Sequence, residues 1–385
     1  MNAFPFPGSF SVALATMLVS LTINLFWTSK MQPTREAAVK MLRLSDQDYF
    51  QFGEEAQSRI QQQLIVMNRY EGTALGGPST VDVGVRESLP VLWATRLSNL
   101  RRWQVVSMRN STVIVSDRSR GKITVHDAFF GPKKIDHKQV PKSANGNPKD
   151  VPAPKGATAS AEILNLKEVA NLPWQPGRFA ITLIIYDWVS NTVNVELKRH
   201  GQGLSPEQEK ALRFPRAEAL RLMTGYQGMN ASAVPELNFV ASEKTPKMDA
   251  QGVALSVPTT VLSTAPHWLI HGAGKTKLAT CNLVDPAAPA DKVAGQAGDT
   301  IRMPNAMVTF TLLIAQLDSR IPRQIDIQVP VFSQVPPKAG DVVDLAFHID
   351  IKTALHSELA PATYQIYVVA DEHVAGPYPL TVTNN

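Results

Sequence analysis

The sequence predicts a mainly β protein: two β-sandwich-like domains, a helical segment near the N-terminus and a short helical connector. Two observations support this fold class. One pattern occurs twice: a Pro and a small residue, an aromatic residue, alternating apolar residues, an Asp, a polar break and a second alternating run. Most other apolar segments are short and recur at roughly 8 to 12 residues, which is typical of sandwiches and barrels and argues against parallel βαβ units.

The two copies of the repeated pattern cover Pro176 to Leu197 and Pro361 to Val382. Alternation with a period of two on both sides of a break is typical of a β-hairpin with one buried face. These hairpins resemble those that close immunoglobulin-like and fibronectin-type sandwiches, in which a Tyr near the penultimate strand hydrogen-bonds back across a corner. The resemblance implies this role for Tyr364, and for Phe179 the same position without a hydroxyl. It implies an architecture and assigns no functional residue.

Length and composition agree with this fold class. A chain of 385 residues, 44% of them hydrophobic, is long enough for two or three domains that each bury a core. Only 18% of the residues are charged, below the usual ~25%, and Pro is abundant, with 28 residues. Cys281 is the only cysteine, so the chain forms no intrachain disulfide and gives no information on its redox compartment.

Residues 1–30 form an apolar N-terminal segment. No charged residue precedes Lys30, and a run of about 20 apolar residues is long enough to cross a membrane. We expect a membrane anchor or an uncleaved signal, which would bring residues 1–29 into contact with a membrane. Three polar residues fall on one helical stripe and the basic residues follow the segment, so a buried helix or strand of a soluble protein or assembly is the alternative.

Helices are expected in two places, residues 31–75 and residues 201–235. In the first, Ser45 and Asp48 form an N-cap signal, and the apolar residues after them step by three or four. In the second, Ser205 is followed by a Pro at the first helical position. This second helical stretch is interpreted as a connector between the two β domains.

The two β domains are expected over residues 76–200 and 236–385, the second of them immunoglobulin-like. The first contains a flexible basic loop at residues 131–160, whose five Pro and six Lys cannot bury enough apolar surface to order themselves. The loop has no aromatic residue and no Arg, so we expect no nucleic-acid binding. The predicted strands before the closing hairpins are Val81–Val85, Trp103–Met108, Thr112–Ser116, Lys122–His126, Ala161–Leu166, Glu236–Ala241, Val253–Leu262, His267–His271, Met307–Ala315, Gln324–Val331 and Val342–Ile351.

The segment from His271 to Thr276 is superficially similar to a phosphate-binding loop. That motif needs a Gly five positions before its Gly-Lys pair, where this chain has Leu269, and a helix directly after it, where the pattern here predicts strands. We therefore expect no nucleotide at this segment.

Three histidines are the candidates for a metal site. His267 and His271 lie four positions apart, so both side chains share one face of a strand or a helix, as metal ligands must. His348, together with Asp350 or His356, would complete three or four ligands. The alternative is that they are strand-surface or satisfied core histidines, because no further ligand motif accompanies them.

Other residues capable of chemistry have a structural interpretation. Asp187 and Asp371 hold equivalent positions in the two hairpins, where an Asp accepts hydrogen bonds from turn amides. Cys281 has no catalytic signature and is expected to be a buried thiol. The tryptophans belong either to a core or to an exposed platform for a carbohydrate or a partner, and the three in question are Trp174, Trp188 and Trp268.

These observations favour a non-enzymatic binding or assembly protein of the cell envelope, anchored at a membrane, that needs no cofactor and no catalytic residue. Its partner would be a protein or an assembly, with no nucleic acid and no nucleotide. The alternative is a metal-dependent enzyme or a metal-binding protein with a site near His267, His271 and His348.

Overall fold

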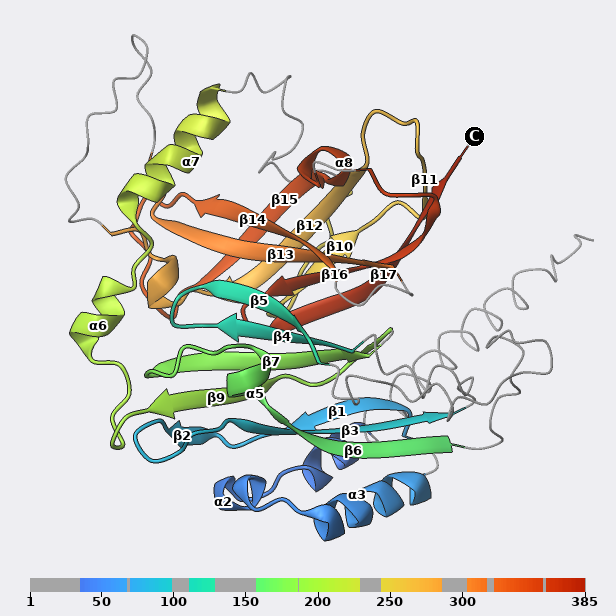
Figure 1. The fold of residues 1–385 in the computed structure, drawn as a ribbon. Helices are drawn as coiled ribbons and strands as arrows, with labels where there is room; N and C mark the ends of the chain where they lie inside the picture. The colour runs from blue at the N-terminus through green and yellow to red at the C-terminus, as the bar shows by residue number, and fades with distance from the viewer. Residues whose placement is uncertain are drawn as a thin grey trace, which may run out of the picture.

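The computed structural model describes residues 35–67, 70–98, 111–128, 157–185, 187–228, 244–285, 303–316, 322–355 and 358–384. Residues 35–41 are helical. The further elements, in chain order, are α2 (Asp46–Phe50), α3 (Glu54–Val66), β1 (Gly72–Gly76), β2 (Thr80–Asp82), β3 (Pro90–Ser98), β4 (Ser111–Asp117), β5 (Lys122–Asp127), β6 (Ala157–Asn165), α5 (Leu166–Val169), β7 (Gly177–Ile185), β8 (Trp188–Val189), β9 (Val193–Lys198), α6 (Pro206–Ala211), α7 (Arg216–Gly228), β10 (Gly252–Ser256), β11 (Thr260–Leu262), β12 (Leu269–Lys277), η3 (Thr280–Asn282), β13 (Ala306–Gln316), β14 (Arg323–Val331), β15 (Val342–Asp350), α8 (Ile351–Ala354), β16 (Ala362–Ala370) and β17 (His373–Thr383) (Figure 1).

The strands form two units with the same topology. Each unit has a three-stranded antiparallel sheet and a larger sheet. In the larger sheet, the strand that comes first along the chain pairs in parallel with the strand that comes last along the chain, β2 with β9 in the first unit and β11 with β17 in the second. The first unit has the orders β1-β3-β6 and β2-β9-β7-β4-β5, and the second has β10-β12-β15 and β11-β17-β16-β13-β14. We call residues 72–198 the first repeat and residues 252–383 the second repeat. The mainly β, multi-sheet fold predicted from the sequence is thereby confirmed.

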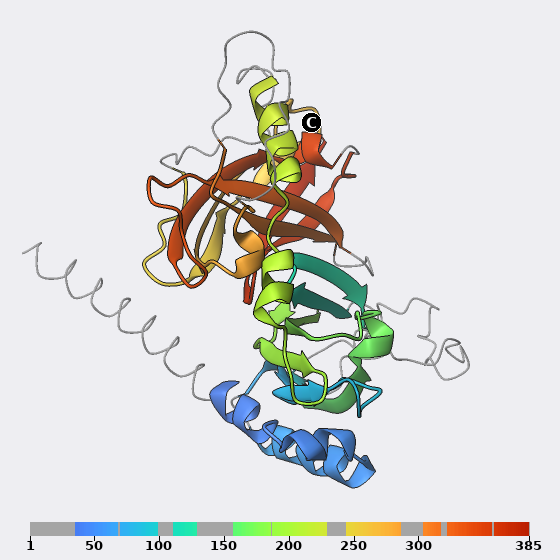
Figure 2. The same cartoon turned by 90° about the vertical axis from the view of Figure 1, so that its left-hand side faces the viewer.

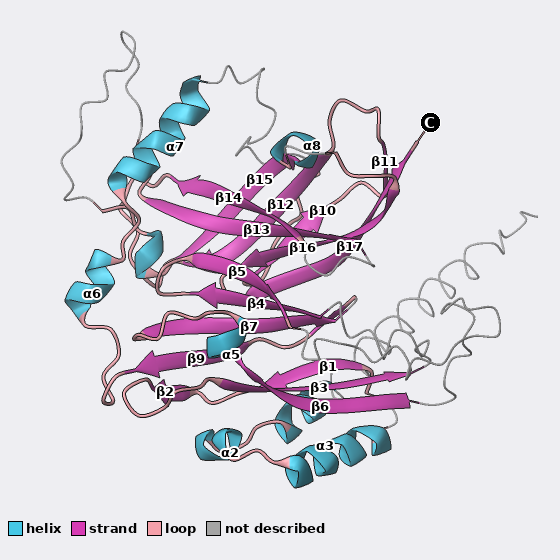
Figure 3. Ribbon diagram, viewed as in Figure 1, coloured by secondary structure: helices cyan, strands magenta, loops and turns pink. Residues whose placement is uncertain are grey.

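The sheets and the N-terminal helices are stacked in layers (Figures 1 and 3). Hydrophobic clusters lie between successive layers. The N-terminal helices pack on the outer face of β1-β3-β6, and the core of the first repeat lies between its two sheets. A third cluster joins the larger sheets of the two repeats, and the core of the second repeat lies behind it. Figure 2 shows α6 and α7, in yellow-green, running along one side of the stack from the first repeat towards the second.

The helix starts expected from the sequence carry the predicted caps. Ser45 accepts a hydrogen bond from the amide of Asp48, whose carboxylate accepts one from the Ser45 amide. Ser205 and Gln208 form the same reciprocal box at α6. Each box satisfies two amides that a helix start would otherwise leave without a partner.

The repeat extends further than the closing hairpins. Both repeats begin with a Gly at positive φ, 134° at Gly72 and 155° at Gly252, a backbone region open to glycine at little cost. After each Gly the two sequences share an Ala-Leu pair, a Pro and a Thr-Val pair at matching spacings, and these residues shape β1 with β2 and β10 with β11. From the sequence, we predicted the repeat only in the hairpins.

The Tyr corner implied by the resemblance is present in the second repeat. The Tyr364 hydroxyl donates a hydrogen bond of 2.8 Å to the Ala360 carbonyl oxygen. Phe179 occupies the equivalent place in the first repeat and is buried in its core.

Several expected boundaries were wrong. β1 begins at Gly72, within residues 31–75, which were expected to be helical, and residues 157–160 of the expected basic loop belong to β6. The strand expected over Val253–Leu262 is two strands, since it is interrupted at Pro258, and β3 was not foreseen. The N-terminal segment 1–30, the rest of the basic loop and the strands expected at Trp103–Met108 and Glu236–Ala241 lie outside the described residues. The division into two separate domains stays a prediction.

Candidate functional site

The two repeats face each other through equivalent surfaces. Ile114 of β4 and Leu313 of β13 occupy equivalent positions in their sheets. Ile114 lies three residues before Asp117, which pairs with Phe179, and Leu313 lies three residues before Gln316, which pairs with Tyr364. Both belong to one buried cluster, in which Ile184 and Ile123 of the first repeat meet Tyr367 and Val369 of the second. Two units that pack through the same patch resemble an isologous dimer interface built within one chain.

Arg118 forms ion pairs between the two repeats at one end of this junction. It lies in the β4–β5 turn of the first repeat, and its guanidinium donates to the carboxylate of Asp371 at 2.7 and 2.9 Å and to Glu372 at 3.2 Å. Asn194 and Thr192 of the first repeat also donate to Glu372, through its carboxylate and its carbonyl oxygen. Bidentate Arg–carboxylate pairs are geometrically specific, so this contact fixes the angle between the repeats.

The connector is tied to both repeats. Arg178 at the start of β7 forms an ion pair with Glu209 of α6. Beyond α6, the Phe214 amide donates to the Leu283 carbonyl at 2.9 Å, and the Asp285 amide donates to the Phe214 carbonyl at 3.1 Å. The connector therefore spans the junction and is bonded to both repeats, unlike a free linker.

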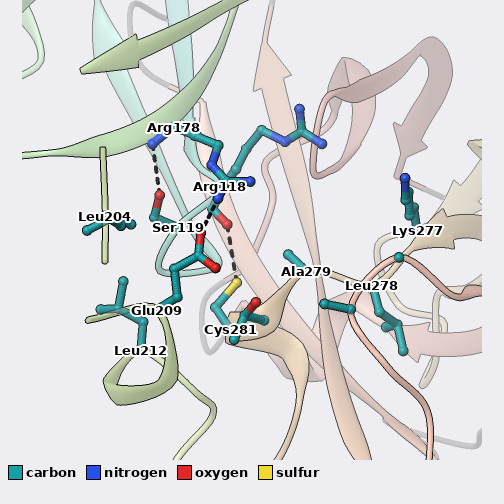
Figure 4. A pocket seen from close by; sticks show the side chains of 13 residues that line it. Arg118, Ser119, Arg178, Leu204, Glu209, Leu212, Lys277, Leu278, Ala279 and Cys281 are labelled. Carbon is teal, nitrogen blue, oxygen red and sulfur yellow. Dashed lines mark hydrogen bonds and ion pairs between the residues drawn. The ribbon is translucent and has the colours of Figure 1, made fainter. Parts of the chain in front are cut away.

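A cavity of about 350 Å³ opens where the repeats and the connector meet (Figure 4). Arg118, Arg178 and Glu209 lie on one side of it, Lys277 and neighbouring residues lie on the other, and Cys281 lies between the two sides. Ligand pockets often occupy such domain junctions, and this volume is at the lower end of their usual range. Arg118 and Arg178 are already paired with carboxylates.

The described lining of this cavity presents the thiol of Cys281, the carboxylate of Glu209 and the cations of Arg118, Arg178 and Lys277. Burial raises the pKa of the Cys281 thiol to about 12, so the thiol stays protonated. Its sulfur donates to the Arg118 carbonyl oxygen at 3.3 Å. The described lining residues include no His to act as a base. The expectation that Cys281 is a buried thiol is confirmed.

The structure brings two of the three candidate metal ligands together. His271 of β12 and His348 of β15 lie directly opposite each other, with ring centroids 5.6 Å apart. Burial, together with a neighbouring positive charge, lowers the pKa of each imidazole. His267 instead contacts Asp350, and His356 lies outside the described residues. Among the described residues no group of three or more His, Cys, Asp or Glu is arranged to hold a metal.

Asp350 is a fully buried carboxylate that joins three elements of the second repeat. Its oxygens accept from the Trp268 amide at 2.8 Å and from the Lys352 amide and the Thr353 hydroxyl at 3.1 and 2.9 Å. His267 Nδ1 lies 2.8 Å from the same carboxylate. Burial alone would raise the pKa of Asp350, but these hydrogen bonds outweigh it and hold the pKa below its ordinary value. This Asp caps α8 and serves the fold.

The remaining candidates have separate roles. Asp371 was expected to bind turn amides, and its described partner is instead Arg118 across the junction. Asp187 is exposed. Trp268 is buried, with its indole bonded to the Leu262 carbonyl oxygen, which agrees with the core interpretation and removes it from any exposed platform. Trp174 donates to Arg86, and the ring of Trp188 covers Gly72.

The segment that is superficially similar to a phosphate loop, His271 to Thr276, lies entirely within strand β12. Its backbone pairs with β10 and β15 on the two sides. These amides are therefore held in sheet ladders and do not converge on a phosphate.

The residues that join the two repeats carry no recognisable local sequence pattern. Arg118 was visible only as part of a tight turn between two predicted strands, Arg118 to Gly121. Its partner Asp371 lies 253 positions away. Local patterns carry no signal for such a contact.

Comparison with known proteins gives little further information. The chain matches no protein-family model and no curated protein. Among solved structures, a β-glucuronidase of Bacteroides uniformis is similar at 9% identity and a TM-score of 0.16, over 77% of this chain and 26% of the glucuronidase. A serine-rich repeat adhesion glycoprotein of Streptococcus agalactiae has the same identity of 9% and TM-score of 0.16, over 81% of this chain and 96% of its own. We draw no conclusion from either similarity.

In the part of the chain that the structure describes, no helix combines the length and the apolar character that a membrane span requires.

Proposed function

We propose that this chain is a non-enzymatic binding or assembly protein of the cell envelope. One observation supports the proposal: the side chains most capable of catalysis form structural hydrogen bonds and ion pairs between elements of the fold. Arg118 is bound to Asp371, Asp350 caps α8 and bonds Trp268, and the Cys281 thiol donates to a backbone carbonyl oxygen. The Arg118–Asp371 pair joins the two repeats, whereas the Asp350 contacts stabilise the second repeat alone. Sandwich modules of this kind act by presenting loops and sheet edges to a partner.

The envelope location rests on the sequence. Residues 1–29 carry no charge and are long enough to contact or cross a membrane. Cell fractionation tests this part: we expect the full chain in the membrane or envelope fraction and a chain without residues 1–29 in another fraction. An unchanged distribution of the truncated chain would contradict the proposal.

The non-enzymatic part is tested at the histidines. Replacing His267, His271 and His348 together by Ala should leave the cellular role intact, while deleting residues 1–29 should abolish it. The opposite pattern would favour the metal-dependent alternative, for which the facing pair His271 and His348 is the one supporting observation. Metal analysis of the purified protein, with the triple variant as control, separates the two: stoichiometric metal lost only in the variant would support the alternative.

A further inference from the structure

Strand β15 has one edge that no described strand pairs with. It lies at the end of the order β10-β12-β15, pairs with β12 over all nine of its residues and runs from Val342 to Asp350. An unpaired edge of this length presents a row of backbone donors and acceptors to another strand.

The other described edges are shorter, protected or covered. β14 is as long as β15 but carries Pro330 and the charged residues Arg323 and Asp326. β1 and β10 have five residues each, and β5 has six. β6, the counterpart of β15 in the first repeat, has its outer face covered by α3, whose Ile60 and Leu64 lie in one cluster with Ala161. β15 has no Pro and no Lys, and of its two charged residues Asp344 is exposed while Asp350 is fully buried.

The sequence of β15 is complementary to itself around Ala346. Leu345 and Phe347 flank Ala346, and Asp344 and His348 follow on either side. Leu345 and Phe347 point into the core of the second repeat, so by alternation Asp344, Ala346 and His348 share the outer face of the sheet.

An antiparallel pair of two β15 strands centred on Ala346 would place Asp344 of each copy opposite His348 of the other. The same register places Leu345 opposite Phe347 on the inner face, and Val343 opposite Ile349. Apolar pairs directly across from each other stabilise antiparallel strands, and the imidazole of His348 can donate a hydrogen bond to the Asp344 carboxylate of the other copy. A like-charged pair does not arise in this register.

The side chains concerned are available for this pairing. The Asp344 side chain is 73% exposed, and its described partner, Lys275 at 3.6 Å on the neighbouring strand, forms an exposed pair that contributes little. The His348 side chain is half-buried, and its Nδ1 is buried without a hydrogen-bond partner among the described residues.

We propose that β15 is a self-association surface through which a second copy of this chain adds its own β15, with twofold symmetry about Ala346. The two three-stranded sheets then form one continuous six-stranded sheet, β10-β12-β15 of each copy. The inference deepens the proposed function, on which it rests for its biological meaning, by naming one partner of the assembly protein.

Cross-linking tests the register. Directly opposite residues of antiparallel strands have Cα atoms about 4.5 to 5.5 Å apart, within the disulfide range of roughly 4.4 to 6.8 Å. Ala346→Cys should therefore give a disulfide-linked dimer on oxidation of the full chain. The matched control is Ser256→Cys on β10, at the far edge of the same sheet, which should give none. Cys281 is buried and remains unchanged in both variants.

Charge exchange tests the pairing without a new cysteine. Asp344→His places two His opposite each other, and His348→Asp places two Asp opposite each other, twice in each dimer. Each single variant should weaken dimerisation by about tenfold, measured by sedimentation at increasing protein concentration. The double variant Asp344→His with His348→Asp should restore it, since the pairs are then complementary again.

Three results would overturn the inference: a monomer at every concentration, cross-linking no stronger at position 346 than at position 256, or single charge variants that dimerise like the unmodified chain. A monomer would leave the proposed function standing, because that is tested by fractionation and by the histidine variants. Loss of envelope location on deleting residues 1–29 has no bearing on purified dimers.

Discussion

Arg118 and Asp371 join the two repeats by a bidentate ion pair, with Nε to Oδ1 at 2.7 Å and Nη2 to Oδ2 at 2.9 Å. Burial raises the pKa of Asp371, and the adjacent guanidinium of Arg118 opposes that rise. The carboxylate thus depends on Arg118 to remain ionised where water is partly excluded. Because each residue lies in a turn of a different repeat, the pair couples the two cores.

We expect Arg118→Ala to lower the free energy of unfolding by about 1 to 2 kcal/mol, because it leaves Asp371 half-buried and without its cation. Urea unfolding of Arg118→Ala, Asp371→Ala and the double variant measures the coupling between them. Arg221→Ala is the matched control, since Arg221 and Glu218 form an exposed pair on α7, with an Arg side chain 70% exposed. A coupling free energy no larger than the effect of the control would contradict this role.

The strands that the sequence predicted are those with one dominant buried face. β9 alternates between buried and more exposed residues, and the expected strand was found there. β3 was missed because both its faces are buried: Trp93 packs into the core of the first repeat and Leu92 packs under the N-terminal helices. A strand covered on both faces shows no alternation.

The junction was beyond the reach of local patterns for a different reason. Its apolar residues, such as Ile184 and Leu313, look like ordinary residues of strands with apolar runs, and nothing in a strand's own sequence states what covers its second face. Residue types capable of chemistry were identified, but their partners were not. Asp350 and His267 lie 83 positions apart; they were named as candidate metal ligands, with satisfied core histidines as the alternative, and the cap was not recognised.

The apolar junction should hold the two repeats in one cooperative unit. Leu313 is fully buried between the repeats and lies outside both sandwich cores. Leu313→Ala should cost about 2 to 4 kcal/mol of unfolding free energy, whereas Leu313→Asp should split urea unfolding into two transitions, since it places a charge in the junction and leaves each core intact. Val335→Ala, at a side chain that is 75% exposed, is the control and should change little.

The same apolar cluster affects the fragment from Pro235 to Asn385, which we predict to fold alone. Cut from its partner, this fragment would expose Leu313, Tyr367 and Val369. We expect a folded but self-associating fragment, and dispersed amide resonances that sharpen on Leu313→Lys would show both properties. An unfolded fragment would mean that the repeats share one core.

Acid should weaken the second repeat through Asp350. The pKa of Asp350 is lower in the folded protein than in the unfolded chain. The stability that this carboxylate contributes is therefore present above the ordinary pKa of an Asp and is lost as the pH falls through the lowered pKa. Thermal midpoints measured from about pH 7 to about pH 3 should fall more steeply for the unmodified chain than for Asp350→Asn. Asp350→Ala should cost about 3 kcal/mol at neutral pH because it leaves the Trp268 amide without its acceptor. Equal slopes for the unmodified chain and Asp350→Asn would contradict the assignment.

Cys281 should report on opening of the junction. Its thiol is buried against the Arg118 turn, and a pKa of about 12 leaves almost no thiolate at neutral pH. Since the thiolate is the reactive form, labelling by an aromatic disulfide should be at least about a thousandfold slower than for a free thiol. Arg118→Ala should speed labelling by loosening the turn that covers the sulfur, while Arg221→Ala should not. Rapid labelling of the unmodified protein under native conditions would show that the junction is open in solution, and equal rates in the two variants would separate Cys281 from the Arg118 contact.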